Sequence, residues 1–473
     1  MYAFSMTLDS KAKEPLYEQL YRSIVSEIRG GRLRPGERLP SKLALCAALG
    51  VSRSTVETAY SLLSAEGYIR SEPRRGCFVS DLVALDAPSD PSGRDWQKAS
   101  CASQSERSGG GEVPAAAPEF DFSISAVDTS CFPYASWAKL NREVVYGSPE
   151  LLQRGDRQGD AVLRRALCAF LSQYRGVRCT PEQIVVGAGL EYLSAVLLQL
   201  FPRDAVFGLE DPGYAAIYHT ARTLGRSFRH ISVDGEGLST EELEATDVSV
   251  VYVTPSHQFP LGVLMPASRR SRLLRWAAAG RERWIIEDDY DSEFRYTSRP
   301  LPAMQGQDPL ERVVYVGTFS RSLAPSIRIA YLVLPPPLLE RYRGLSGYAS
   351  STVSRYEQAV MARFLDEGFY ARYLHRVGMR YRKRRERLLS GLSAIPGTRI
   401  SGDGGGLHFL LHNIRFSEEE LLLRARSEGI TLQGLSDYCH QCRPVPSTLV
   451  LGFGGLADEK TEEAIQRLAA AWK

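Results

Sequence analysis

The sequence predicts two folded domains joined by a linker: a small, mainly helical N-terminal domain and a large α/β domain built on a parallel sheet. The 473 residues exceed what one compact core normally holds. Residues 82–118 are rich in Ser, Ala, Gly and Pro without apolar periodicity, which is typical of a flexible linker. After this segment, strand-like runs such as QIVVGA, VSVVYVT, RWIIED and VVYVGTF alternate with helical patterns. We therefore expect domains at residues 1–81 and 119–473.

Charge and composition narrow the class of protein. Residues 7–80 carry 12 Lys and Arg against 8 Asp and Glu, whereas the rest of the chain carries 46 against 47. Such a local cationic excess indicates nucleic-acid binding. No run of about 20 uncharged apolar residues occurs, and the start lacks the order of a signal peptide, so we expect a cytoplasmic protein. The eight cysteines are sparse, and Cys439 and Cys442 lack the second ligand pair that zinc needs, so free thiols and no metal are expected.

The first predicted element is an amphipathic helix. In LYEQLYRSIVSEIRGG the apolar residues Leu16, Leu20, Ile24 and Ile28 recur every four positions, which is the spacing of one helix face. The two glycines that follow end the pattern. This helix precedes a Pro-Gly turn in RLRPGERLP.

Two short helices are predicted next. Ser41 can cap the helix KLALCAAL, Gly50 ends it, and Ser52 can cap the helix RSTVETAYSLLSAEG. Two short helices joined by a tight turn form a helix-turn-helix, whose second helix enters the major groove with its N-terminal residues toward the bases. That first turn consists of Arg53, Ser54 and Thr55.

A two-stranded wing completes the N-terminal domain. The run YIRSEPRRGCFVSD predicts two short strands around a turn that has Arg74 and Arg75 at its tip. Arginines at a wing tip would meet phosphates or the minor groove. The N-terminal domain is therefore predicted to be a winged helix-turn-helix, α with a small β wing.

The segments PLYEQL, GRLRPGERLPS, LGVSRSTVETAYSLLSAEGYI and GCFV resemble the winged helix-turn-helix of the GntR family over residues 14–80. The resemblance implies binding to a double-stranded DNA operator through Ser41, Lys42, Ser52, Arg53, Ser54, Thr55, Arg74 and Arg75. One departure is Leu43, where the family usually has an arginine that contacts the DNA backbone, so that Lys42 would supply the charge at a different angle. The alternative for Arg53 is a solvated surface charge.

The large domain resembles the fold-type I aminotransferases. The segments FDFSISAVDTSCFPYASW, RGDRQGDAVLRRALCAFL and RGVRCTPEQIVVGAG are similar to the entry segment of that fold, specifically in the MocR subfamily, in which a GntR head is fused to such a domain. The resemblance covers residues 119–473. It implies a bacterial transcription regulator, a homodimer, and a pocket for pyridoxal phosphate.

That cofactor needs a phosphate cradle, an acid near its ring nitrogen and a partner for its phenolic oxygen. Gly189 and Leu190 open a helix after a strand, where backbone N–H groups bind phosphate. The resemblance assigns Asp288 to the ring nitrogen and Tyr290 to the phenolic oxygen. A shift of one residue would put Glu287 or Asp289 in place of Asp288.

Two further segments are matched to the surroundings of the cofactor. Tyr214 corresponds to a tyrosine near the ring, and its alternative is a half-buried aromatic at a helix start. In TPSHQFPLG, His257 and Gln258 are the polar candidates.

The segment VVYVGTFSRSLAPSIRIAYLVLP decides the chemistry. Family members carry a lysine after Thr-Phe-Ser that forms the internal aldimine, and this chain has Arg321 there. A guanidinium with a pKa above 12 is neither a nucleophile nor a base near neutral pH, so we expect no catalytic residue and no covalent cofactor. Thr318, Ser320 and Arg328 match the phosphate cup, and Arg328 suits bidentate phosphate binding. Pyridoxal phosphate would then bind non-covalently, if at all.

Two other positions depart from a working aminotransferase. Val450 stands where an arginine clamps the substrate carboxylate, and Ala216 stands where an arginine helps to hold the effector in a GABA-responsive member. We therefore predict a regulator that senses pyridoxal phosphate or an amino-acid-related ligand through an inactive aminotransferase-like domain. The alternatives are an active aminotransferase and a regulator whose large domain is only a dimerisation scaffold.

Overall fold

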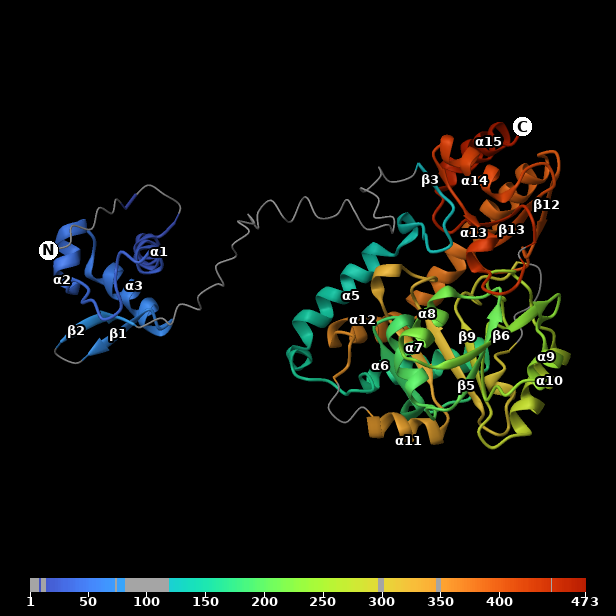
Figure 1. Ribbon diagram of the computed structural model, residues 1–473, viewed down its shortest axis with the longest axis horizontal. Helices are drawn as coiled ribbons and strands as arrows, with labels where there is room; N and C mark the ends of the chain where they lie inside the picture. Colours follow the sequence, from blue (N-terminus) through green and yellow to red (C-terminus); the bar gives the residue numbers. More distant parts are fainter. Residues whose placement is uncertain are drawn as a thin grey trace, which may run out of the picture. The chain divides into compact units, whose positions relative to one another are not determined.

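The computed structural model describes residues 8–9, 14–72, 75–80, 119–296, 302–345, 350–443 and 445–473 (Figure 1). The chain divides between residues 113 and 114 into two compact units, each described here by itself. The linker predicted at residues 82–118 lies outside the described residues. Within the described residues, none of the helices combines the length and the apolar character needed to cross a bilayer.

The N-terminal unit is a winged helix-turn-helix, as predicted. Its elements are α1 (Leu16–Arg29), α2 (Lys42–Leu49), α3 (Arg53–Ala65), β1 (Ile69–Glu72) and β2 (Gly76–Val79). The two strands pair antiparallel, with Ile69 opposite Val79. Leu20, Ile24 and Ile28 of α1 are buried in the core of this unit, which also contains residues of α3. The every-fourth-residue pattern therefore corresponds to the buried face of α1.

The predicted caps fix where the two short helices begin and end. The Ser41 hydroxyl accepts a hydrogen bond from the Ala44 backbone N–H at 3.2 Å. Gly50 ends α2 in the left-handed conformation with φ +65°, which a glycine adopts without steric cost. The tight turn between α2 and α3 thus follows from these residues.

The large unit is built on an eight-stranded sheet with the order β4-β11-β10-β9-β8-β5-β6-β7. Its strands are β4 (Ile184–Gly187), β5 (Val206–Asp211), β6 (Ser227–Asp234), β7 (Gly237–Leu238), β8 (Val250–Val253), β9 (Trp284–Asp289), β10 (Val313–Thr318) and β11 (Ala330–Val333). Neighbouring strands from β10 to β6 pair parallel, as predicted for the sheet.

Two strands of this sheet depart from the predicted parallel arrangement: the short edge strand β7, which pairs antiparallel with β6, and β11. β11 pairs antiparallel with both β10 and β4. The 11 residues between β10 and β11 contain only a short 3-10 helix, η5 (Pro325–Ile327), which is too short for the helical crossover that parallel neighbours need. Because two antiparallel pairings restore the direction, β4 ends at the same edge of the sheet as β10.

Helices flank this sheet, and a second sheet follows it in the chain (Figure 1). The helices are α5 (Tyr134–Gly147), α6 (Ala161–Arg175), α7 (Leu190–Gln199), α8 (Ala215–Thr223), α9 (Thr240–Glu244), α10 (Ala267–Ala278), α11 (Pro336–Leu345), α12 (Arg355–Asp366), α13 (Phe369–Ser393), α14 (Glu418–Ser427) and α15 (Thr461–Ala471). The second sheet has the order β12-β13-β16-β15, with β12 (Thr398–Ser401), β13 (His408–Asn413), β15 (Gln433–Gly434) and β16 (Thr448–Gly452).

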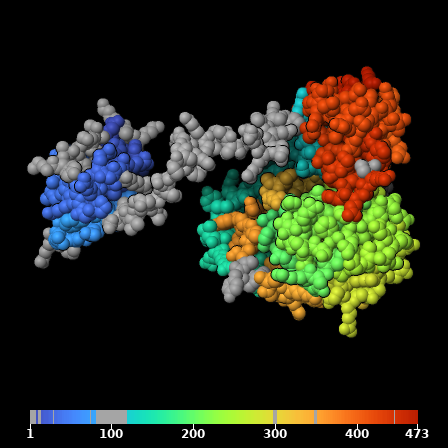
Figure 2. Space-filling model, in the orientation of Figure 1, coloured from blue at the N-terminus to red at the C-terminus, as the bar shows by residue number. Residues whose placement is uncertain are grey.

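The start of the large unit joins its C-terminal part. β3 (Phe120–Asp121) pairs parallel with β14 (Ile430–Thr431). Figure 2 shows the C-terminal residues, in red, as a lobe that lies against the green and yellow part of the same unit. This pairing brings the segment after β3 to the boundary between the two lobes, where the candidate pocket lies.

Candidate functional site

The start of α3 carries residues that are predicted to contact DNA. The Ser52 hydroxyl lies 2.9 Å from the Ser54 hydroxyl and 2.8 Å from the Thr55 hydroxyl, and it accepts a hydrogen bond from the Thr55 backbone N–H at 3.2 Å. These contacts hold the first turn of the helix in one shape. The side chain of Arg53 is 70% exposed, so its guanidinium is available at the end of the helix that this fold places in the major groove.

Glu57 is part of this surface, although we did not predict it. Its Oε1 lies 3.1 Å from Nε of Arg53 and 3.7 Å from Nζ of Lys42 on α2. The hydrogen bond from Arg53 lowers the pKa of Glu57, so the carboxylate is charged at neutral pH. The spacing of four residues on one helix is the signal that could have identified the pair.

Leu43 and the wing complete the DNA-facing candidates. Leu43 is 71% exposed on α2, so the position that departs from the family pattern faces solvent. In the wing, Nη1 of Arg75 lies 2.6 Å from Glu72, and its guanidinium lies over the ring of Phe78. Arg74 lies outside the described residues.

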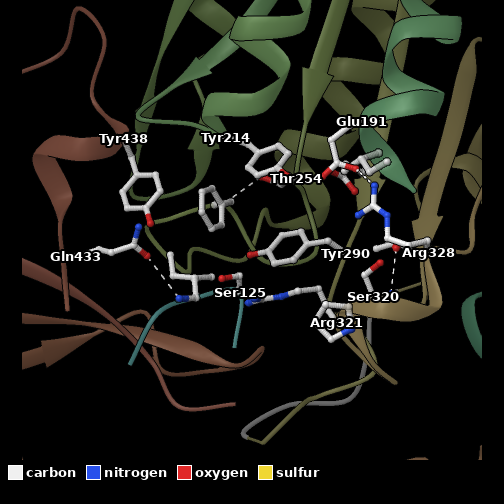
Figure 3. A pocket seen from close by; sticks show the side chains of 16 residues that line it. Ser125, Glu191, Tyr214, Thr254, Tyr290, Ser320, Arg321, Arg328, Gln433 and Tyr438 are labelled. Carbon is white, nitrogen blue, oxygen red and sulfur yellow. Dashed lines mark hydrogen bonds and ion pairs between the residues drawn. The ribbon is translucent and has the colours of Figure 1, made fainter. Parts of the chain in front are cut away.

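A pocket of about 360 Å³ opens where the parallel strands of the large sheet end (Figure 3). Its lining includes most of the residues predicted to hold a cofactor, namely Leu190, Tyr214, Asp288, Tyr290, Thr318, Ser320, Arg321 and Arg328. Two predicted residues lie beside it: Gly189 caps α7, and His257 lies behind Tyr290. The segments identified separately in the sequence therefore meet in one cavity.

Asp288, at the end of β9, is the acid that faces the pocket. Its Oδ2 accepts a short hydrogen bond from the hydroxyl of Tyr252, and its Oδ1 is buried without a partner among the described residues. Burial raises the pKa of Asp288 to about 7. Near neutral pH the carboxyl is thus close to half protonated and can donate or accept a hydrogen bond.

The two neighbouring acids are bound elsewhere. Glu287 accepts hydrogen bonds from the backbone N–H groups of Met304 and Gln305, both at 2.8 Å. Asp289 forms a buried ion pair with Arg175 at 2.6 Å. Because alternate strand residues face opposite sides, these two acids hold the sheet to its neighbours, and Asp288 alone of the three lines the pocket.

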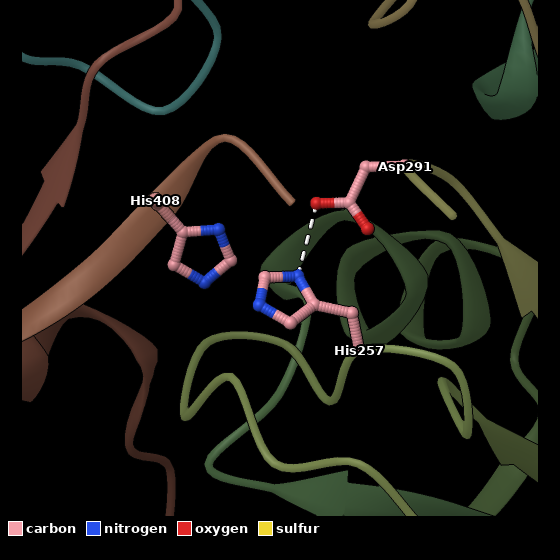
Figure 4. A group of neighbouring side chains, drawn as sticks. All are labelled: His257, Asp291 and His408. Atoms are coloured by element: carbon pink, nitrogen blue, oxygen red, sulfur yellow. Dashed lines mark hydrogen bonds and ion pairs between the residues drawn. The ribbon is translucent and has the colours of Figure 1, made fainter. Parts of the chain in front are cut away.

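Tyr290 contacts a buried polar cluster of His257, Asp291 and His408, which Figure 4 shows. Its hydroxyl donates to the backbone carbonyl of His257 at 2.9 Å and lies 3.0 Å from Nδ1 of the same residue. That Nδ1 also lies 3.0 Å from Oδ2 of Asp291, and the ring of His408 stands 4.7 Å from the ring of His257.

The protonation of His408 follows from its contacts. Its Nε2 lies 3.0 Å from the carbonyl of Pro260, which can only accept, so Nε2 carries the proton. Burial lowers the pKa of His408 to about 3, which keeps the ring neutral. Among the described residues, His257, Asp291 and His408 lie close enough together to bind a metal ion. Gly406 packs tightly against this cluster, because a Cβ at that glycine would lie 2.2 Å from Asp291.

Gln258 has a structural role beside this cluster. Its Nε2 donates to the carbonyl of Pro212 at 3.0 Å, and its Oε1 accepts from the backbone N–H of Leu261 at 3.0 Å. Both ends of the amide therefore bind the loop, and the side chain is buried away from the cavity.

The other end of the pocket lies at the N-terminus of α7. Nη2 of Arg328 lies 2.6 Å from Oε2 of Glu191, in the first turn of the helix. A Cβ on Gly189 would lie 2.3 Å from that Nη2, so only glycine lets the arginine approach here. Burial alone would raise the pKa of Glu191, but the hydrogen bond from Arg328, a backbone hydrogen bond and the charge of Arg328 together lower it. Thr318 accepts a hydrogen bond from the Ser320 N–H at 3.1 Å.

Aromatic rings form much of the remaining wall. The ring of Phe259 meets the rings of Tyr214, Tyr290 and Tyr438 edge-on, at centroid distances of 5.7, 5.8 and 5.1 Å. Burial raises the pKa of Tyr214 to about 12, so its hydroxyl stays protonated at neutral pH. A flat aromatic ligand could pack against aromatic side chains on several sides of this cavity.

Eight lining residues were not predicted as site residues. Four of them, Glu191, Thr254, Phe259 and Pro325, lie within or beside the predicted segments, and the other four are Ile124, Ser125, Gln433 and Tyr438. These last four come from the segment after β3 and from β15 and η6 (Leu435–Tyr438), which the pairing of β3 with β14 brings near the large sheet. The backbone N–H of Ile124 contacts Gln433 Oε1 at 3.5 Å. Nothing local in the sequence marks these residues as neighbours of Asp288.

Three places that we singled out in the sequence are Val450, Ala216 and the turn that contains Cys439 and Cys442, and the structure describes each of them. Val450 is fully buried on β16 in one apolar cluster with the lining residues Ile124, Phe259, Tyr290 and Tyr438. Ala216 lies on α8. Asp211 accepts hydrogen bonds from the backbone N–H groups of the turn at His440, Gln441 and Cys442.

Comparison with protein families divides the chain into the same two parts. Residues 16–79 match the bacterial regulatory proteins of the gntR family, and residues 120–468 match the aminotransferases of class I and II.

Whole-length relatives combine both parts. The chain is 39% identical to the HTH-type transcriptional regulator YdeL of Bacillus subtilis, over 97% of each chain. It is 31% identical to the probable rhizopine catabolism regulatory protein MocR of Rhizobium meliloti, over 99% of this chain and 96% of the relative. It is also 31% identical to the pyridoxine biosynthesis regulator PdxR of Corynebacterium glutamicum, over 94% and 92%.

Solved structures match the large unit. The kynurenine aminotransferase of Pyrococcus horikoshii superposes with a TM-score of 0.66 and 24% identity, over 74% of this chain and 90% of that one. The multiple substrate aminotransferase of Thermococcus profundus gives a TM-score of 0.67 at 23% identity, over 76% and 92%. These likenesses establish the fold of residues 120–468 as that of the aminotransferases.

Proposed function

Because this chain belongs to the MocR-type regulators of the gntR family, we propose that it binds operator DNA and regulates transcription. Its aminotransferase-like domain then senses a small molecule, pyridoxal phosphate or an amino-acid-related ligand, without catalysing a reaction. One observation supports the second part: Asp288, Tyr290 and Arg328 line one pocket together with Arg321, which the family resemblance matches to the position of the reactive lysine. A cavity that retains binding groups and lacks the reactive amine is suited to recognition.

The N-terminal surface supports DNA binding. Arg53 and Lys42 are exposed at the recognition end of α3, and among the described residues Glu57 is the acid that pairs with both. Phosphate or base edges can displace a solvated carboxylate at little cost, since exposed ion pairs contribute about 0–1 kcal/mol. We infer that this face of α2 and α3 meets the major groove.

Pyridoxal phosphate fits part of the pocket. Asp288 and Tyr290 would hold its ring nitrogen and phenolic oxygen, and Thr318, Ser320 and Arg328 would hold its phosphate. When bound in this fold, the group supplies an electron sink for amino-acid chemistry. Arg321 offers no nucleophile for covalent attachment, because its guanidinium stays protonated. Val450 offers no charge for a substrate carboxylate. Both substitutions support binding without turnover.

A homodimer is part of the proposal. Val145, Tyr146 and Leu152 are 50%, 84% and 78% exposed at the end of α5 and in the 3-10 helix η2 (Pro149–Leu152). Clustered apolar side chains on a surface mark interaction sites. We expect light scattering at micromolar concentration to give the mass of two chains, and a monomer would contradict this assembly.

The function can be tested on the purified full-length protein. Footprinting on the DNA upstream of its own gene and of neighbouring genes should protect a site with two half-sites separated by whole helical turns. Native mass spectrometry should find any bound ligand released by denaturation, because no covalent link is expected. Failure to protect any DNA would refute the regulator, and a borohydride-fixed pyridoxyl group at residue 321 would refute catalytic inactivity.

A further inference from the structure

The two arginines of the pocket differ in what they contact (Figure 3). Arg328 is paired with Glu191 at 2.6 Å. Arg321 runs in the opposite direction, toward Ser125, as Figure 3 shows. Its Nε and Nη2 are buried and have no hydrogen-bond partner among the described residues. Arg321 has therefore lost water at two nitrogens without gaining a carboxylate.

This difference leaves a defined charge in the cavity. Arg321 and Arg328 are the two cations among the described lining residues. Glu191 neutralises Arg328, and Asp288 is only partly ionised near neutral pH. Asp291, buried behind Tyr290, also acts on Arg321 through its charge, but its Oδ2 is bound to His257. The guanidinium of Arg321 therefore remains a cation whose Nε and Nη2 contact no carboxylate of the described residues. A monoanion would balance it, whereas a phosphate dianion would exceed it.

The phosphate end already holds a carboxylate of the protein, in an ion pair whose two side chains are 47% and 54% exposed. A phosphate at the N-terminus of α7 would stand where the Glu191 carboxylate already accepts from Arg328. It could bind only by displacing that carboxylate or by meeting its negative charge. At the opposite end Val450 is apolar and lies in the cluster that backs the wall, and Asp291, the buried acid whose charge acts on Arg321, is bound to His257.

We propose that this pocket binds a planar ring that bears a carboxylate, held by Arg321, in preference to a phosphate ester held by Arg328. The proposal rests on the ligand-sensing function inferred above and narrows its ligand class. A carboxylate matches the planar fork of a guanidinium and can accept two of its hydrogen bonds. The ring would lie among Tyr214, Phe259 and Tyr438, and its polar edge would face Asp288. The substitution that removes the reactive amine thus supplies an anion-binding group.

The first experiment compares charged probes with neutral ones. Full-length protein is titrated by calorimetry with nicotinate and 4-pyridoxate, and with their neutral counterparts nicotinamide and pyridoxine. We expect the carboxylates to bind at least about tenfold more tightly, since the comparison isolates one charge-assisted interaction. Arg321→Met should abolish this preference. Arg229→Met is the matched control, because Arg229 is exposed and pairs with Asp247 outside the pocket.

The second experiment tests the ion pair at the phosphate end. Glu191→Gln should free Arg328 and raise the affinity for pyridoxal phosphate by up to about fivefold, because the pair that it removes is exposed, while nicotinate binding changes little. Circular dichroism and thermal melting establish that each variant is folded. If Arg321→Met is unfolded, Arg321→Gln, which also removes the charge, serves in its place.

The outcomes separate the ligand class from the sensing function. Tighter binding of pyridoxal phosphate than of 4-pyridoxate by the unmodified protein overturns the ligand class and leaves sensing intact. Equal carboxylate binding by Arg321→Met also overturns it. Carboxylate binding that depends on Arg321 but leaves operator affinity unchanged supports the ligand class and refutes sensing. Absence of binding by every probe refutes both.

Discussion

The surface around Arg53 at the start of α3 and the pocket of the large unit differ in how their arginines are paired and exposed. Arg53 is 70% exposed and paired with Glu57, whereas Arg321 is half-buried and two of its nitrogens lack any partner among the described residues. Water screens the first pair, so its carboxylate yields readily to DNA. Water is excluded around much of the second guanidinium, so an anion that reaches it gains more. Under the proposed functions, an arginine would bind DNA weakly at the first site and select a ligand at the second.

The largest expected effect comes from restoring the reactive amine. Arg321→Lys should allow pyridoxal phosphate, added in excess, to be fixed by borohydride at residue 321, because a lysine ε-amine can be deprotonated and a guanidinium cannot. The unmodified protein should show no fixation there. Mass spectrometry of the peptide that spans β10 and β11 measures both. A fixed group in the unmodified protein would mean that Arg321 is not at the covalent position.

The second effect concerns the buried acid of the pocket. The pKa of Asp288 is raised to about 7 by burial, so its protonated form favours folding at low pH, and this contribution is lost as the pH rises through 7. Between about pH 5 and pH 8 the loss is on the order of 3 kcal/mol. Asp288→Asn, which cannot ionise, should reduce this decline in urea unfolding of the large domain and leave the part due to Glu210 and Glu293, whose pKa values burial raises to about 7 and about 8.

The control for that experiment is the exposed acid of the other region. Glu57→Gln should leave the pH dependence between pH 5 and pH 8 unchanged, because Glu57 is charged throughout this range and solvated. An equal decline with pH in Asp288→Asn and in the unmodified protein would show that Asp288 does not titrate there.

The third effect lies on the DNA side. Arg53→Ala should weaken specific operator binding by about 1–3 kcal/mol if the arginine reads a base edge, with a smaller change on unrelated DNA. A gel shift at fixed salt concentration measures both affinities. Unchanged operator affinity would show that Arg53 does not contact a base and is a solvated surface charge.

The two regions also differ in how far the sequence predicts them. The winged helix-turn-helix follows from consecutive residues: the caps at Ser41 and Ser52 and the glycine after α2 set its turns locally. The acids of β9 are adjacent in the sequence, and only the alternation of strand faces, seen in the folded sheet, separates Asp288 from its neighbours.

Partners distant in the sequence could not be foreseen. Glu191 and Arg328 are 137 residues apart, and their ion pair depends on the antiparallel β11 that returns the chain beside β4. Gln433 and Ile124 meet only because β14 pairs with β3. The sequence thus identified the groups of the pocket and missed the contact that decides which arginine is available to a ligand.

The smallest expected effect is the removal of the acid from the DNA-facing surface. Glu57→Gln releases Arg53 and Lys42 from an exposed pair, so it should tighten binding to operator and to unrelated DNA alike, by less than about 1 kcal/mol. The gain should shrink as salt increases, because counterions screen both the pair and the phosphates. Glu462→Gln, on α15 outside the N-terminal unit, removes the same charge from the chain as a control. If Glu57→Gln instead weakened binding by several kcal/mol, the carboxylate would be contacting a base, and Glu57 would be a DNA-reading residue and not only a screened partner of Arg53.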